Sequence, residues 1–122
     1  MTLLKTCLAV SALALTAAGA QAGEIAVIVK TTNSNFWQNV NLGAQAAIEG
    51  LSEHTLSFDG PAAESAVADQ VSLVENAINR GVAGLVLAPS DPEALIPVVQ
   101  RAYESGIPVV IIDSALGEGG EG

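Results

Sequence analysis

The chain has 122 residues, of which 50% are hydrophobic and only 3% are aromatic, a composition with room for one globular domain. Four basic residues stand against thirteen acidic ones, which gives a formal net charge of −9 at pH 7. So few bases cannot build the basic face that binding to nucleic acid or to an anionic membrane surface requires.

The first 22 residues have the pattern of a secretory signal peptide. Lys5 supplies the basic start, residues 7–18 form an apolar stretch, and residues 20–22 form a small-residue cleavage site. Because the apolar stretch is too short to span a bilayer, we expect no membrane insertion after cleavage. Cleavage after Ala22 would also remove Cys7, the single cysteine, so the mature chain would have no disulfide, thiolate nucleophile or cysteine metal site.

Beyond this segment, short apolar runs alternate with stretches of helical periodicity. Gly81 is placed to end the second helix, and Asp91-Pro92 has the form of a helix cap followed by proline at the first helical position. Pro97 lies inside the third helical pattern and should kink that helix. The expected strands are 25–29, 55–58, 84–87 and 109–112, and the expected helices are about 36–51, about 63–80 and a third between Asp91 and residues 106–108.

The order of elements is βαβαβαβ, and three of the four strands are continuously apolar. Such strands joined by helices predict an α/β fold with a doubly wound parallel sheet covered on both faces. Right-handed crossovers and the usual winding give the spatial order 2-1-3-4, with a switch point between the first and third strands. We expect the domain to occupy residues 23–116, and residues 117–122, which are rich in glycine, to form a flexible tail.

Polar and aromatic side chains follow the first strand, where a parallel sheet presents its ligand crevice. The loop at residues 31–37 offers hydroxyls and amides, including Ser34, and then the rings of Phe36 and Trp37. This combination suits an uncharged polyhydroxy molecule with one flat C–H face, as in a sugar. The alternative is that both rings only pack the first turn of the following helix.

Two further strand ends contribute Asp91, Asp113 and Ser114. An ionised Asp113 can accept two hydroxyl hydrogen bonds from a sugar, although it could instead bond neighbouring loop amides. Asp91 is first of all a helix cap. These loops contain no acid pair, no nucleophile–base pair and no metal-ligand spacing, so we expect a binding protein with no cofactor and no metal, and not an enzyme.

Four motifs in register resemble the ribose-binding class of periplasmic sugar-binding proteins (type I). They are TTNSNFW at 31–37, LGAQAA at 42–47, GVAGLVLAPSD at 81–91 and GIPVVIIDS at 106–114. The resemblance implies the solute receptor of an ABC importer, in which two α/β lobes close on a sugar. The family's chains are more than twice this long, so the resemblance implies a partial N-terminal lobe, truncated here.

The resemblance also implies binding roles by position. Phe36 and Trp37 match the aromatic pair that sandwiches the sugar ring, Ser34 matches a hydrogen-bonding position, and Asp113 matches the acid that binds hydroxyls. Ribose-type members have arginine where Ser114 stands, so a ribose-like specificity is in question, and another sugar, a polyol or a smaller solute stays open.

The implied partners are a small neutral sugar or polyol and the membrane permease of an ABC importer, with the receptor in the periplasm. One alternative is the effector-binding domain of a LacI-type transcription regulator, which shares the fold but would need a helix-turn-helix where the signal peptide stands. Another is a truncated product without function. A dinucleotide-dependent enzyme is disfavoured because no G-x-G-x-x-G follows the first strand.

Overall fold

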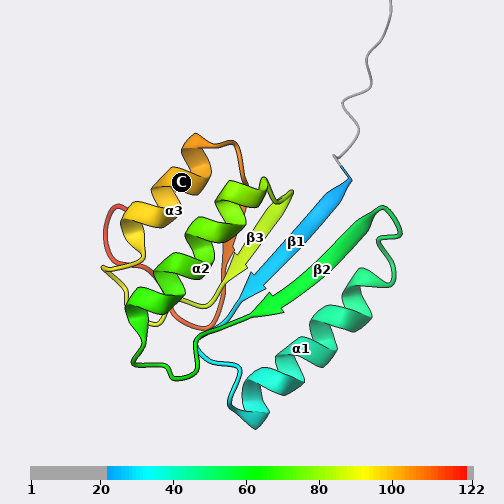
Figure 1. The fold of residues 1–122 in the computed structure, drawn as a ribbon, viewed down its shortest axis with the longest axis horizontal. Helices are drawn as coiled ribbons and strands as arrows, with labels where there is room; N and C mark the ends of the chain where they lie inside the picture. Colours follow the sequence, from blue (N-terminus) through cyan, green and yellow to red (C-terminus); the bar gives the residue numbers. More distant parts are fainter. Residues whose placement is uncertain (1–21, 121–122) are drawn as a thin grey trace, which may run out of the picture.

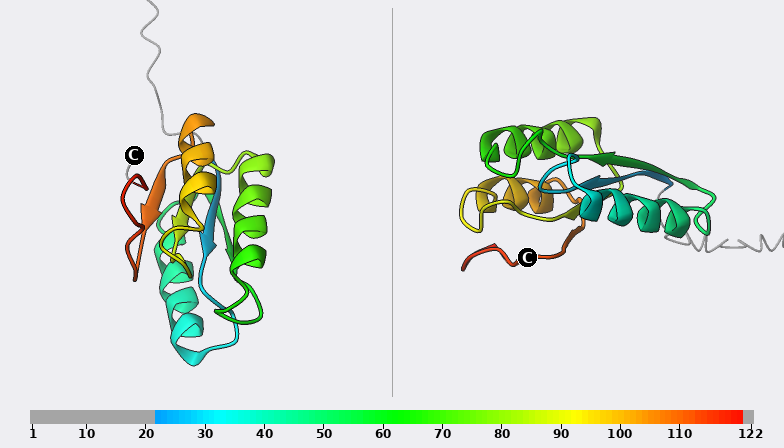
Figure 2. Two further views of the ribbon diagram at one scale, coloured as in Figure 1. Left: turned by 90° about the vertical axis from the view of Figure 1, so that its left-hand side faces the viewer. Right: turned by 90° about the horizontal axis from the view of Figure 1, so that it is seen from below.

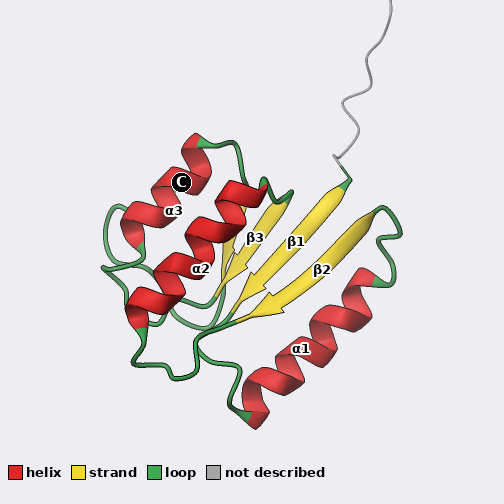
Figure 3. Ribbon diagram, viewed as in Figure 1, coloured by secondary structure: helices red, strands yellow, loops and turns green. Residues whose placement is uncertain are grey.

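The computed structural model describes residues 22–120, which fold as strands alternating with helices (Figures 1 and 3). The predicted signal peptide lies outside the described residues except for Ala22. The elements in chain order are β1 (Gly23–Ile28), α1 (Asn35–Ile48), β2 (His54–Asp59), α2 (Val67–Arg80), β3 (Gly84–Leu87), α3 (Ile96–Glu104) and β4 (Val109–Ile111).

The strands form one parallel sheet with the order β2-β1-β3-β4, so the predicted fold class and strand order are both confirmed. Ile25 of β1 lies opposite Leu56 of β2 on one side and Gly84 of β3 on the other. All four strands therefore end at the same edge of the sheet, and the loops that follow them gather there.

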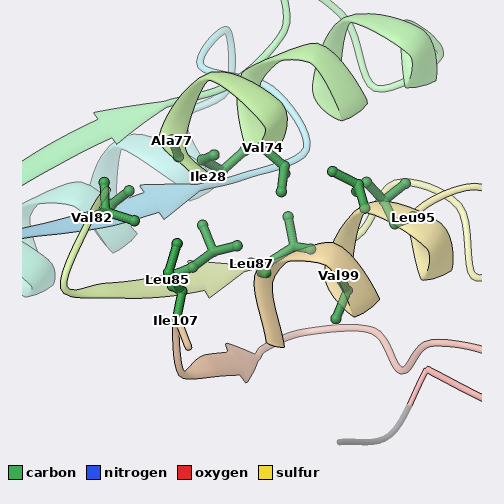
Figure 4. Packing of buried hydrophobic residues seen from close by; sticks show 12 residues of the cluster. Ile28, Val74, Ala77, Val82, Leu85, Leu87, Leu95, Val99 and Ile107 are labelled. Carbon is green, nitrogen blue, oxygen red and sulfur yellow. The ribbon is translucent and has the colours of Figure 1, made fainter. Parts of the chain in front are cut away.

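Helices cover both faces of the sheet, with α2 and α3 on one face and α1 on the other (Figure 2). Side chains of β1 and of the residue after it alternate accordingly: Ala26 and Ile28 belong to the core under α2 and α3, while Val27 and the following Val29 belong to the core under α1. The larger core joins β1 and β3 to α2 and α3, and nine of its residues are labelled in Figure 4. This two-sided burial explains why three strands are continuously apolar.

The α1 face of the sheet is less completely covered than the other. An apolar groove of about 390 Å³ lies between α1 and the sheet. Farther along the same face, Val110 of β4 is 58% exposed. The groove is lined by Ile25, Val27, Val40, Ala44, Ala47, Ile48, Leu51, Leu56, Val86 and Ile112. It lies on the face of the sheet, not among the loops at the strand ends, and its lining offers no polar group to a sugar.

The start of α3 corrects one expectation. The helix begins at Ile96, after the turn residues 92–95, so Pro97 lies in its first turn and produces no kink. Proline is tolerated there because the first N–H groups of a helix have no intrahelical acceptor. The second helix also begins later than expected, at Val67 instead of about residue 63, but it ends as predicted at Gly81, which adopts a left-handed conformation with φ 69°.

The residues after β4 fold back along α3 as far as they are described. Leu116 packs against the larger core, the Gly117 N–H donates to the Pro92 carbonyl at 2.9 Å, and Gln100 Nε2 donates to the Gly119 carbonyl at 3.0 Å. Residues 117–120 therefore have defined contacts. The mobility predicted for this tail stays a prediction.

Candidate functional site

The loops after β1, β3 and β4 carry the residues predicted for a ligand crevice. The loop after β1 is organised by its own polar groups: Thr31 Oγ1 accepts from the Asn33 N–H at 3.1 Å, and Gln38 of α1 donates to the Thr32 carbonyl at 2.7 Å. The Thr32 N–H donates to the Pro61 carbonyl of the neighbouring loop at 3.3 Å. The hydroxyls and amides that suggested a sugar site are thus partly used to hold the loop in shape.

A charged cluster joins the ends of β1 and β4. The Lys30 ammonium lies 2.7 Å from Asp113 Oδ2 and donates to Ser114 Oγ at 2.6 Å. The Ser114 hydroxyl in turn donates to Asp113 Oδ2 at 3.1 Å. The structure thus brings together two predicted site residues, Asp113 and Ser114, and adds Lys30, for which the sequence had suggested no role in the site.

Two features of Asp113 stand out. Its φ of 66° places it in the left-handed region, where, among the described residues, it is the one that is not glycine. Such conformations cost free energy and gather at functional sites. The Lys30 hydrogen bond is the main cause that lowers the pKa of the Asp113 carboxyl, and the Ser114 hydroxyl adds to it while partial burial opposes it. Asp113 is therefore a carboxylate at neutral pH, able to accept hydrogen bonds.

Phe36 and Trp37 occupy different environments although they are neighbours in α1. The indole of Trp37 is only 3% exposed and packs with Val27, Val29 and Ala88, whereas Phe36 is 59% exposed. The two rings meet edge to face, with centroids 4.8 Å apart and planes at 81°. Phe36 thus presents much of its ring to solvent, while the buried Trp37 contacts it from the core.

The remaining predicted residues have local roles in the structure. Asp91 Oδ1 accepts from the backbone N–H groups of Ala94 at 2.7 Å and Glu93 at 2.9 Å, and these bonds lower the pKa of Asp91. The sequence predicted Asp91 as the cap of the third helix with Pro92 as its first residue. That prediction was wrong in position, because the N-cap of α3 is Leu95 and Asp91 instead caps the turn at residues 92–95. Ser34 stands at the N-cap position of α1, where its side chain makes no capping hydrogen bond.

Three residues that contact the loops or the predicted site residues were not predicted from the sequence. Gln70 is fully buried and hydrogen-bonds the loops after β1 and β3. The signal was a polar residue three positions after Val67 on the apolar face of a helix. Glu64 Oε1 accepts from the indole Nε1 of Trp37 at 3.4 Å, and Lys30 pairs with Asp113. Neither of these two contacts has a local signal, because the partners are distant in sequence.

Between residues 22 and 120 the structure contains no group of three or more His, Cys, Asp or Glu side chains that could hold a metal ion. No helix in the same range is long and apolar enough to cross a membrane.

A doubly wound lobe with polar side chains at its strand ends is the arrangement in which open α/β sheets commonly bind ligands. The chain belongs to the periplasmic binding protein family, since the family model described as "Periplasmic binding protein domain" matches residues 25–122. Among curated proteins it is 37% identical over 91 residues to the D-ribose/D-allose-binding protein of Pseudomonas aeruginosa, covering 74% of this chain and 28% of that protein.

Solved structures agree with this assignment. An ABC transporter solute-binding protein from Agrobacterium vitis with bound D-fucose is 66% identical, with a TM-score of 0.78 over 79% of this chain and 33% of that one. A carbohydrate transporter solute-binding protein from Agrobacterium radiobacter in complex with D-arabinose is 36% identical, with a TM-score of 0.73 over 77% of this chain and 31% of that one. The chain thus spans about a third of the length of these relatives.

Proposed function

We propose that this chain is the sugar-binding part of the solute receptor of an ABC importer, and that it binds its ligand without chemistry. The observation that carries the proposal is the Lys30–Asp113–Ser114 cluster at the strand ends. The ion pair has no net charge, yet it offers donors and acceptors together. Such a site suits a neutral molecule with many hydroxyls better than an anion or a cation.

The geometry suggests how the cluster would hold a sugar. Both contacts of the Asp113 carboxylate within the described residues use Oδ2, so Oδ1 is available to accept from ligand hydroxyls. The Lys30 ammonium has three donors, of which Asp113 and Ser114 use two. Ribose-type members carry arginine at the position of Ser114, and this chain lacks the donors of that arginine. Lys30 would supply part of the missing donor capacity.

The aromatic residues would complete the site by apolar contact. The exposed ring of Phe36 can cover the C–H face of a sugar, and Trp37 would act mainly by holding that ring edge to face. Ser34 and Asp91 are proposed as further hydrogen-bonding residues for the sugar. Asp91 has less capacity for this role, because Oδ1 already accepts from two backbone N–H groups.

The ligand class follows from the relatives. Solute-binding proteins solved with D-fucose, D-arabinose and D-allose are similar to this chain, and the one with D-fucose is 66% identical. We therefore propose a neutral monosaccharide, with D-fucose as the first compound to test and a polyol as the second class. These relatives are solute-binding proteins of transporters. None of them favours the alternative of a LacI-type regulator.

Export to the periplasm and docking to a membrane permease belong to the same proposal. The family is periplasmic by its description, and the first 22 residues have the signal-peptide pattern. We further propose that cleavage after Ala22 releases a domain of residues 23–116 and that the chain is part of a two-lobed receptor.

The test is an NMR titration of residues 23–122 with D-fucose, D-ribose, D-allose and D-arabinose. We expect binding in the millimolar range, because a single lobe leaves ligand hydroxyls exposed to water, where each hydrogen bond contributes only about 1 kcal/mol. The resonances of Phe36, Asp113 and Ser114 should shift first.

A pair of variants makes the test specific. Asp113→Asn should weaken binding about tenfold or more, the effect of losing hydrogen bonds to a charged group. Asp59→Asn is the matched control, because Asp59 also ends a strand, but among the described residues its side chain accepts a hydrogen bond only from the N–H of its neighbour Gly60. Equal affinity in both variants, or no shift with any of the four sugars, would refute the proposed function.

A further inference from the structure

Gln70 is a buried polar side chain that bonds two loops at once. Its side chain is fully buried, with 0% of its surface exposed. Nε2 donates to the Val29 carbonyl at 3.0 Å and to the Ala88 carbonyl at 2.8 Å, and Oε1 accepts from the Ser90 N–H at 2.8 Å. A single amide on α2 therefore reaches the backbone just beyond the ends of both β1 and β3.

The topology explains why polar backbone groups are left over at this point. β1 and β3 are neighbours in the sheet, but the chain leaves β1 toward α1 on one face and leaves β3 toward α3 on the other (Figure 2). Once the strands diverge, the carbonyls of Val29 and Ala88 can no longer bond a neighbouring strand. Buried backbone groups without partners are costly, and a side-chain amide with two donors and an acceptor can satisfy them together.

The two loops that Gln70 joins are those that carry the proposed site. Lys30 follows Val29 directly, and Ser90 lies two residues after Ala88 and next to Asp91. The geometry points to Gln70 as a positioning residue: we propose that it fixes the spacing of the β1 and β3 loops, and through them the Lys30–Asp113 cluster, without touching the sugar. This inference rests on the proposed function for its link to sugar binding, but the hydrogen bonds to the loops can be tested separately.

The first test uses the unsubstituted chain, residues 23–122, and needs no sugar. In amide NMR spectra the side-chain NH₂ protons of Gln70 should exchange slowly with solvent, and the backbone N–H of Ser90 should be protected. Gln100 is the internal control, because its side-chain NH₂ also donates to a carbonyl but is exposed. If Gln70 exchanges as fast as Gln100, the amide does not hold the loops and the proposal fails.

The second test removes the hydrogen bonds. Gln70→Leu keeps the volume but has no polar group, whereas Val74→Ala on the same helix removes buried apolar contacts and leaves the loops bonded; Val74 is likewise 0% exposed. The global free energy of unfolding is measured for each variant, and the exchange rates are corrected for the difference between them. After this correction, the Ser90 N–H should exchange at least about fivefold faster in the Gln70 variant than in the Val74 variant. Equal rates in the two variants would overturn the positioning role.

The third test connects the loops to the ligand. With D-fucose as the probe, Gln70→Leu should weaken binding by roughly two- to thirtyfold, the range in which residues that touch no ligand modulate affinity. Val74→Ala should change affinity less than twofold. Where Gln70→Leu does not fold, Gln70→Met replaces it, because the unbranched side chain of methionine is close to glutamine in length but has no donor for the two carbonyls.

The outcomes separate the two proposals. If the unsubstituted chain shows no D-fucose shift, the proposed function fails for this sugar, and the exchange measurements still decide whether Gln70 positions the loops. Suppose instead that the unsubstituted chain binds D-fucose and that Gln70→Leu speeds Ser90 N–H exchange without changing the affinity. Gln70 then only holds the two loops together, and its role in the sugar site is refuted.

Discussion

Replacing Trp37 by alanine should destabilise the domain strongly, whereas replacing its neighbour Phe36 should not. The Trp37 indole is 3% exposed within the core under α1, so its removal leaves a large cavity. Deleting a buried tryptophan costs about 3–5 kcal/mol. Phe36 is 59% exposed, and its loss should cost about 1 kcal/mol or less, mainly from the edge-to-face pair.

These magnitudes are large against the total. Domains of this size are stable by about 5–15 kcal/mol, and each kcal/mol moves the melting temperature by about 4–8 °C. Trp37→Ala should therefore lower the melting temperature by at least about 12 °C. Far-UV circular dichroism during urea and thermal unfolding is the suitable measurement, because Trp37 is the single tryptophan and its fluorescence is lost in the variant.

Two results would refute this reasoning. A loss below about 1 kcal/mol for Trp37→Ala would mean that the indole is not packed in the core and is free to stack on a ligand. Equal losses for Trp37→Ala and Phe36→Ala would mean that the two rings share one environment, contrary to their exposures in the structure.

Three further predictions concern the charged cluster, the edge strand and the N-terminus. Lys30→Met should raise the pKa of Asp113 toward its usual range, because Lys30 is the main cause of the lowering; carboxyl NMR shifts across a pH titration measure this. In the unsubstituted chain the stability from this pair should be complete above the unfolded carboxyl pKa of about 3.9 and should be lost as pH falls through the lower folded pKa. We expect copies of the chain to associate through β4, because β4 is an apolar strand at the edge of the sheet and Val110 is exposed. This association should grow with salt, because screening weakens the repulsion between the acidic chains. Val110→Lys should reduce it, and size-exclusion chromatography over a salt series measures the change. N-terminal sequencing of the exported protein should give Gly23 as its first residue.

Each of these three has a control or a clear contrary result. Arg101→Met removes an exposed ion pair with Glu75 and should leave the pKa of Asp113 unchanged. If Arg101→Met shifts this pKa as much as Lys30→Met does, the cause is the net charge of the chain and not the hydrogen bond from Lys30. A salt-independent monomer would show that β4 does not drive association. Recovery of the chain with Met1 intact in the cytoplasm would contradict export.

The local sequence determined the architecture. Apolar runs and helical periodicity predicted every strand and helix of the described region, and chain order with right-handed crossovers gave the arrangement 2-1-3-4. Gly81 marked a helix end correctly because the left-handed conformation there favours glycine. The start of α3 was misjudged because a proline in the first turn and a proline inside a helix look alike until the starting residue is known.

The tertiary structure decided the site. Asp113 was predicted as a ligand residue from its strand end, but its partner Lys30 follows a different strand and is more than 80 positions away. The helical pattern placed Trp37 on the apolar face of α1, yet only packing decided that its ring is buried while Phe36 stays exposed. Gln70 became meaningful only when β1 and β3 were seen to diverge beside it. Periodicity is a property of neighbouring residues, whereas these contacts depend on which strand ends the folded sheet brings together.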